Sequence, residues 1–174
     1  MKRHTWTITA VAALLVLLAL AWRSPDRQKG LTDYEAAGTM RHIVTADIVA
    51  LQVTSGPRRL RFERRNGAWL RADGNATTDA GASATIEASL RLLHNTPPER
   101  SFDSATPAFG LDSTALQVRA QTADSRVFEI AFGATNPMGL ARYVRTRSDG
   151  VETLLLMPTY VAEGWEQLVA KEAR

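Results

Sequence analysis

The chain has 174 residues, which is room for one domain of ordinary size plus an appendage. Its composition, 45% hydrophobic and 22% charged, is typical of a folded protein, and its formal net charge of only +3 is too weak to indicate a nucleic-acid-binding protein. Cysteine is absent, which excludes disulfides, thiolate metal sites and cysteine nucleophiles.

A predominantly apolar run without a charged residue covers residues 6–22. As a helix it would measure about 25 Å, near the lower limit for crossing a hydrocarbon core of about 30 Å. Trp6 and Trp22 at its ends suit the aromatic belts of the two membrane interfaces. We therefore predict a transmembrane anchor over residues 1–22. The alternative is a cleaved signal peptide, with Lys2 and Arg3 as its positive region.

The charges that flank this run leave its orientation open, because basic residues both precede and follow it. A short tail before a signal-like segment stays most simply in the cytoplasm. We therefore expect a single-pass protein of a bacterial inner membrane, with its C-terminal domain in the periplasm.

Residues 23–42 show no sustained hydrophobic period and include Pro25, Gly30 and Gly38, which predicts a tether. A single α+β domain is expected over residues 43–174. It begins with a β-meander, because apolar residues alternate over 48–54 and again around Leu60 and Phe62 before reaching Trp69. The turns are predicted at Ser55-Gly56-Pro57 and at Asn66-Gly67, a strong hairpin signal.

A helix should follow the meander, since Ile86, Leu90 and Leu93 recur at helical spacing and Pro97-Pro98 ends the pattern. The candidates for its N-terminal cap are Thr78, Asp79 and Ser83.

Two further hairpins and a last helix complete the predicted domain. Alternation over residues 116–120 and 128–132 predicts the second hairpin, and residues 143–147 and 151–157 predict the third. The C-terminal helix carries Val161, Trp165 and Leu168. Since nearly all connections are too short for parallel crossovers, we expect an α+β fold with antiparallel sheets.

Several segments, in this order and spacing, resemble the bacterial domain of unknown function 4340 family over about residues 45–165. They are residues 48–53, 60–64 and 66–70, a helix led by Asp79, Phe109-Gly110-Leu111-Asp112, and Ile130-Ala131-Phe132-Gly133. Phe109 stands where the family usually has Tyr, and Ser113 stands where Pro often follows the Asp. The resemblance implies an N-terminally anchored extracytoplasmic domain, with some relatives similar to accessory parts of gliding-type transporter systems. It supplies no catalytic residues.

No constellation of residues predicts a catalytic, cofactor or metal site. The three histidines, His4, His42 and His94, have no metal-ligand spacing, and no Gly-x-Ser-x-Gly nucleophile motif occurs. We therefore expect neither an enzyme nor a cofactor-dependent protein.

The most distinctive cluster is a run of arginines between residues 58 and 65. Strand alternation sends Arg59, Arg61 and Arg65 to one face of the sheet. This stripe could contact anionic lipid headgroups or an acidic partner, or it could be a solvated face or an edge protected by charge. Nucleic acid is not expected, because no aromatic residues are interleaved for base stacking.

Together these features predict a membrane-anchored extracytoplasmic accessory or interaction module of a bacterial envelope assembly without catalytic activity, and the resemblance implies an association with a transporter. Its expected partners are the lipid bilayer, through residues 6–22, and an unidentified membrane protein. The alternative is a periplasmic ligand-binding domain, with a hydrolase third. A ligand-binding domain would have a deep pocket lined by Trp69, Trp165 or Tyr143, whereas a module would pack these residues in its core.

Overall fold

The computed structural model describes residues 38–72, 80–106 and 109–171, all of which belong to one compact unit, Ala36–Arg174. The predicted anchor over residues 1–22 and most of the predicted tether lie outside the described residues. In the part of the chain that is described, no helix is long and apolar enough to cross a membrane.

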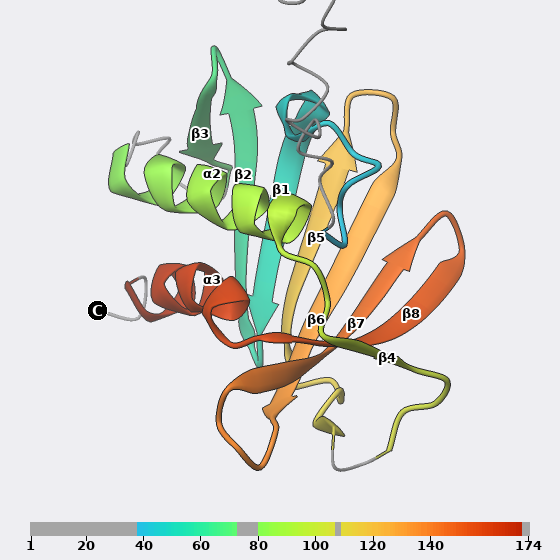
Figure 1. The fold of residues 1–174 in the computed structure, drawn as a ribbon. Helices are drawn as coiled ribbons and strands as arrows, with labels where there is room; N and C mark the ends of the chain where they lie inside the picture. Colours follow the sequence, from blue (N-terminus) through green and yellow to red (C-terminus); the bar gives the residue numbers. More distant parts are fainter. Residues whose placement is uncertain (1–37, 73–79, 107–108, 172–174) are drawn as a thin grey trace, which may run out of the picture. The chain divides into compact units, whose positions relative to one another are not determined.

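One eight-stranded sheet forms the centre of the domain, and every neighbouring pair of strands is antiparallel (Figure 1). Its order is β3-β2-β1-β5-β6-β7-β8-β4. The strands are β1 (Ile48–Ser55), β2 (Arg58–Arg65), β3 (Ala68–Arg71), β4 (Arg100–Phe102), β5 (Leu116–Thr122), β6 (Val127–Thr135), β7 (Ala141–Ser148) and β8 (Val151–Pro158).

The predicted meander, both later hairpins and both helices are confirmed. The helices are α2 (Ala80–Asn95) and α3 (Tyr160–Lys171), and a short 3-10 helix, η2 (Thr45–Asp47), precedes β1. The first turn of the meander places Gly56 at positive φ, and the second places Asn66 and Gly67 there, as the Asn-Gly signal implies.

Two features of the sheet differ from the prediction. The expected separate sheets are one sheet, because β1 pairs with β5 and so joins the meander to the second hairpin. Residues 100–102, for which no strand is predicted, form the edge strand β4, which pairs with β8 at Leu154–Leu156. Three residues are too few for alternation to reveal a strand.

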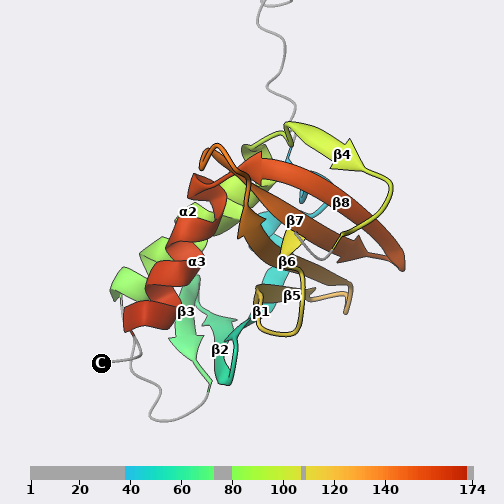
Figure 2. The same ribbon diagram turned by 90° about the horizontal axis from the view of Figure 1, so that it is seen from below.

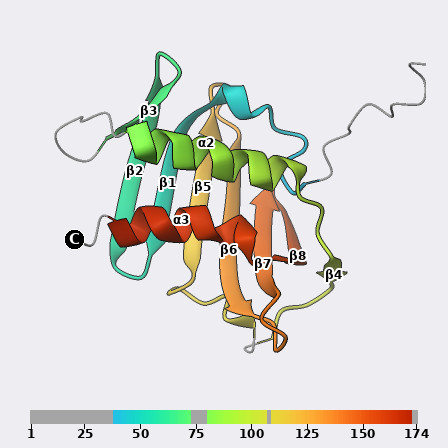
Figure 3. The ribbon, with the colours of Figure 1, turned by 60° about the vertical axis from the view of Figure 1, so that its left-hand side comes forward.

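Both helices lie on one face of the sheet, as Figures 2 and 3 show. Their apolar sides bury the predicted Ile86, Leu90 and Leu93 of α2 and Val161, Trp165 and Leu168 of α3. The strands contribute their alternate residues to the same core, among them Leu51, Val53, Leu60, Phe62, Val118, Phe128, Ile130, Phe132 and Val144. The domain therefore has two layers, with its core between the helices and the sheet.

Ser83, one of the three predicted caps of α2, lies inside this helix. Its hydroxyl accepts a hydrogen bond from the backbone N–H of Trp69 at 3.1 Å, so it ties α2 to β3. The other two candidates, Thr78 and Asp79, lie outside the described residues.

Residues 38–42, within the range predicted as tether, pack against the C-terminal end of α2. The backbone N–H groups of Gly38 and Met40 donate to the carbonyls of His94 and Leu93, at 2.9 and 3.2 Å. These bonds satisfy carbonyls that the end of a helix otherwise leaves without a partner. Met40 is buried in the core, and so is Ile43 just beyond the range. The packed domain therefore begins before residue 43.

Two of the segments that carry the family resemblance meet in space. A Cβ on Gly133 would lie 2.0 Å from the backbone oxygen of Phe109, so only glycine lets this loop approach β6 so closely. The Phe109 ring stacks on Tyr143, with 4.0 Å between the ring centroids. Asp112 accepts hydrogen bonds from the side chain and backbone of Thr114, which hold the pKa of Asp112 below its usual value.

Candidate functional site

The face of the sheet that points away from α2 and α3 is here called the open face. Along β1, Leu51 and Val53 enter the core, so the intervening Gln52 and Thr54 lie on the open face. The same alternation assigns the side chains of every other strand to one face or the other.

All three arginines predicted to form a stripe lie on the open face of β2. Arg59, Arg61 and Arg65 are exposed and alternate with the buried Leu60 and Phe62. Of these three, Arg65 forms an ion pair of 2.7 Å with Glu63, whose side chain is on the same face.

Arg64 has the opposite parity and turns toward the helices. Its guanidinium donates to the carbonyls of Thr45 and Ala46, both at 3.0 Å, and it forms an ion pair with Glu87. Arg64 therefore supports the fold and is not part of the open face.

The strand register aligns polar residues of distant segments into two rows across the open face. The first row is Arg61, Gln52, Arg119, Glu129, Arg147 and Glu152, in strand order from β2 to β8. The second row is Arg59, Thr54, Gln117, Ala131, Arg145 and Leu154.

The predicted stripe did not include three further arginines of the open face, namely Arg119 on β5 and Arg145 and Arg147 on β7. Alternation within each strand could have assigned them a face, but nothing in the sequence indicates that β5 and β7 lie in one sheet with β2. Including these three, β2 and β5–β8 present six arginines and three glutamates on the open face. They are Arg59, Arg61, Arg65, Arg119, Arg145 and Arg147, with Glu63, Glu129 and Glu152.

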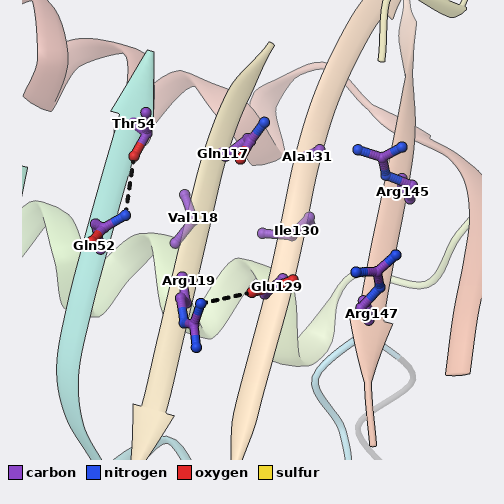
Figure 4. A pocket seen from close by; sticks show the side chains of 10 residues that line it. All are labelled: Gln52, Thr54, Gln117, Val118, Arg119, Glu129, Ile130, Ala131, Arg145 and Arg147. Carbon is purple, nitrogen blue, oxygen red and sulfur yellow. Dashed lines mark hydrogen bonds and ion pairs between the residues drawn. The ribbon is translucent and has the colours of Figure 1, made fainter. Parts of the chain in front are cut away.

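A hollow of about 210 Å³ lies on this face over β1, β5, β6 and β7 (Figure 4). Its polar lining includes Gln117, Arg119, Glu129, Arg145 and Arg147. The hollow is therefore surrounded by positive charge and by amide groups.

The arginines of the hollow differ in their partners. Arg119 forms an ion pair of 3.1 Å with Glu129, and Arg147 forms one of 2.9 Å with Glu152. The side chain of Arg145 makes no ion pair or hydrogen bond with any residue in the described part of the chain, and Figure 4 shows it beside Ala131. Arg145 is also half-buried, so it is a cation with reduced access to water.

The aromatic residues that a deep ligand pocket would require lie elsewhere. Trp69 and Trp165 are fully buried in the core between the sheet and the helices. Tyr143 is half-buried and covered by Phe109. None of the three lines the hollow.

Neither of the two described histidines, His42 and His94, lines the hollow. Nδ1 of His94 lies 3.0 Å from Oδ1 of Asn95, and His42 accepts a hydrogen bond from Arg41 at 3.1 Å, while His4 lies outside the described residues. Across residues 38–72, 80–106 and 109–171, no three His, Asp or Glu side chains are grouped so that they could hold a metal ion.

No family model matches the chain, and neither a curated protein nor a solved structure is significantly similar to it. The function proposed below is therefore argued from the residues of this chain.

Proposed function

We propose that this protein is a membrane-anchored extracytoplasmic interaction module of a bacterial envelope assembly, and that its open face binds an acidic surface of another membrane protein. The observation that carries this proposal is the surplus of arginines on the sheet face opposite α2 and α3. The anchor is the apolar run over residues 6–22, and the resemblance to the domain of unknown function 4340 family agrees with this placement.

The positions of the arginines favour binding over the two structural alternatives. Charges on an edge strand protect it against pairing with other chains. This accounts for Arg59, because β3 pairs only with residues 62–65 of β2 and leaves the edge beside Arg59 unpaired. Arg119 and Arg145 lie on β5 and β7, which have neighbours on both sides, so edge protection does not explain them. Exposed ion pairs on such a face stabilise a fold by only about 0–1 kcal/mol each, so stability is a weak reason for the surplus.

The shape of the open face favours contact with a protein surface over a small-molecule ligand in its hollow. Small-molecule pockets usually enclose about 300–1,000 Å³ and are lined mostly by apolar and aromatic side chains. The hollow measures about 210 Å³ and is lined mainly by charged and amide groups. A broad charged face with a small hollow is better suited to a protein surface.

Changing Arg59, Arg61 and Arg65 together to serine should weaken capture of the membrane partner about tenfold. Losing three exposed charge contacts of about 0.5 kcal/mol each reduces the binding free energy by about 1.5 kcal/mol, which corresponds to about tenfold in affinity. The measurement is crosslinking and affinity capture from intact membranes, with the captured protein quantified.

A matched control changes Arg41, Arg58 and Arg91 to serine, which removes the same charge from exposed positions off the open face. Capture by the control should stay near the wild-type level, and raised salt should weaken capture by the wild type. Equal capture by both triple variants and the wild type would contradict the binding role and indicate that the arginines only form a solvated face.

A reporter phosphatase fused after Arg174 should be active in cells if the domain lies in the periplasm. A fluorescent protein that matures only in the cytoplasm should stay dark at the same position. The opposite result, with an inactive phosphatase and a bright fluorescent fusion, would show that the proposed orientation is wrong.

A further inference from the structure

We infer that the hollow above Ala131 receives a single carboxylate side chain of the acidic partner, held by the guanidinium of Arg145 and the side-chain amide of Gln117. This inference rests on the proposed function and names the point of the open face where the partner is anchored.

The two rows of the open face both carry an arginine on β7 and differ on β5 and β6. In the first row, Glu129 lies between Arg119 and Arg147, so a carboxylate occupies the middle strand. In the second row, Ala131 takes the middle position between Gln117 and Arg145. A methyl group thus replaces the carboxylate that the neighbouring row supplies from the chain itself.

This replacement leaves a gap of suitable width. Neighbouring strands lie about 4.8 Å apart, so the backbones that carry Gln117 and Arg145 are about 10 Å apart across β6. Figure 4 shows the two polar side chains on either side of Ala131. Both can donate hydrogen bonds, and between them only a methyl group rises from the sheet.

The surroundings of Arg145 favour an anion from outside the domain. Its register neighbours are Ala131 and Leu154, both apolar and both buried. A guanidinium is always charged, and holding it half-buried without a partner is unfavourable. A carboxylate matches its planar pair of N–H donors and forms two parallel hydrogen bonds with it.

The size of the hollow indicates one side chain. Since a water molecule occupies about 30 Å³ of liquid, about 210 Å³ accommodates an aspartate or glutamate side chain with a few waters. The ion pair between Arg119 and Glu129 closes one side of the hollow (Figure 4). Because all its walls rise from paired strands, the hollow is formed before the partner binds, which reduces the entropy cost of association.

The test measures binding of a fluorescent hexaglutamate peptide to the full chain in mild non-ionic detergent at low salt, by fluorescence anisotropy. Arg145→Gln should raise the dissociation constant at least about tenfold, because it removes a charged hydrogen-bond donor. The matched control is Arg91→Gln, which removes the same charge from an exposed position of α2 off the open face and should change the dissociation constant about twofold or less. Equal losses for both variants would overturn the inference, since they would indicate a general charge effect.

A second variant supplies the missing carboxylate from within the chain. Ala131→Glu should abolish peptide binding and raise the melting temperature, because the new side chain would pair with Arg145. Glutamine has nearly the same shape as glutamate and carries no charge, so Ala131→Gln should not raise the melting temperature. A melting temperature that changes equally in both variants would overturn the inference.

Three further outcomes distinguish a failure of this inference from a failure of the proposed function. If the wild type binds no hexaglutamate while crosslinking still captures a partner through Arg59, Arg61 and Arg65, the carboxylate site is wrong and the proposed function stands. If Arg145 is required for binding anionic phosphatidylglycerol vesicles and not for binding the peptide, the assignment to a protein carboxylate is also wrong. Peptide binding that depends on Arg145, without any captured membrane partner, would support the site and contradict the proposed function.

Discussion

Replacing Trp165 with alanine should lower the free energy of unfolding by about 3–5 kcal/mol, the range for deleting a buried tryptophan. Trp165 has no exposed surface and packs from α3 into the core between the helices and the sheet. A small domain is stabilised by only about 5–15 kcal/mol in total, so this variant should lose a large share of its stability. Urea unfolding of the full chain in detergent, followed by far-ultraviolet circular dichroism, measures the change.

Trp165→Phe is the informative control for this experiment. The indole N–H of Trp165 is buried without a hydrogen-bond partner among the described residues, so phenylalanine removes an unsatisfied donor and keeps an aromatic ring. We expect Trp165→Phe to lower the free energy of unfolding by less than about 1.5 kcal/mol. The indole N–H of Trp69, by contrast, donates to Glu87 at 2.7 Å. Trp69→Phe removes this hydrogen bond, so it should lower the free energy of unfolding by about 1–3 kcal/mol more than Trp165→Phe does. Equal costs for the two phenylalanine variants would contradict this distinction.

Replacing Glu87 with leucine should lower the free energy of unfolding by about 2–3 kcal/mol, because two half-buried or buried donors would lose their acceptor. The carboxylate of Glu87 accepts from the Trp69 indole and pairs with Arg64, whose guanidinium lies 5.3 Å from the centre of the Trp69 ring. The side chain of Arg64 is only 17% exposed, so water replaces the lost partner poorly.

Glu87→Gln separates the hydrogen bonds from the charge in this cluster. It keeps an oxygen acceptor for the Trp69 indole and removes the negative charge that faces Arg64. We expect Glu87→Gln to lower the free energy of unfolding by about half as much as the leucine variant does, measured by the same urea titration. A glutamine variant as unstable as the leucine variant would indicate that the charge alone stabilises this cluster.

Most secondary structure could be predicted because its signals are local. Alternation with period two located the strands of all three hairpins, and the spacing of Ile86, Leu90 and Leu93 located α2. The Asn66-Gly67 turn follows from the ease with which both residues adopt positive φ. The exceptions were β4, which is too short for alternation, and the segment around Met40, whose burial depends on the end of α2.

The candidate site could be predicted only in part. Alternation along β2 was enough to place Arg59, Arg61 and Arg65 on one face, because those residues share a strand. It could not show that Arg119 and Arg145 join them, since these arginines come from hairpins much later in the chain.

Local patterns along the chain predict the order of the helices and of every strand except β4, the antiparallel α+β class and the face of β2 that carries its arginines. Each of these depends on residues a few positions apart, whose geometry is set by the period of a strand or a helix. Only the tertiary structure decided that β1 pairs with β5, and hence that one sheet aligns β2, β5 and β7. Strand pairing depends on packing the whole core against α2 and α3. The hollow over Ala131, and a guanidinium of Arg145 without a partner among the described residues, therefore exist only in the folded domain.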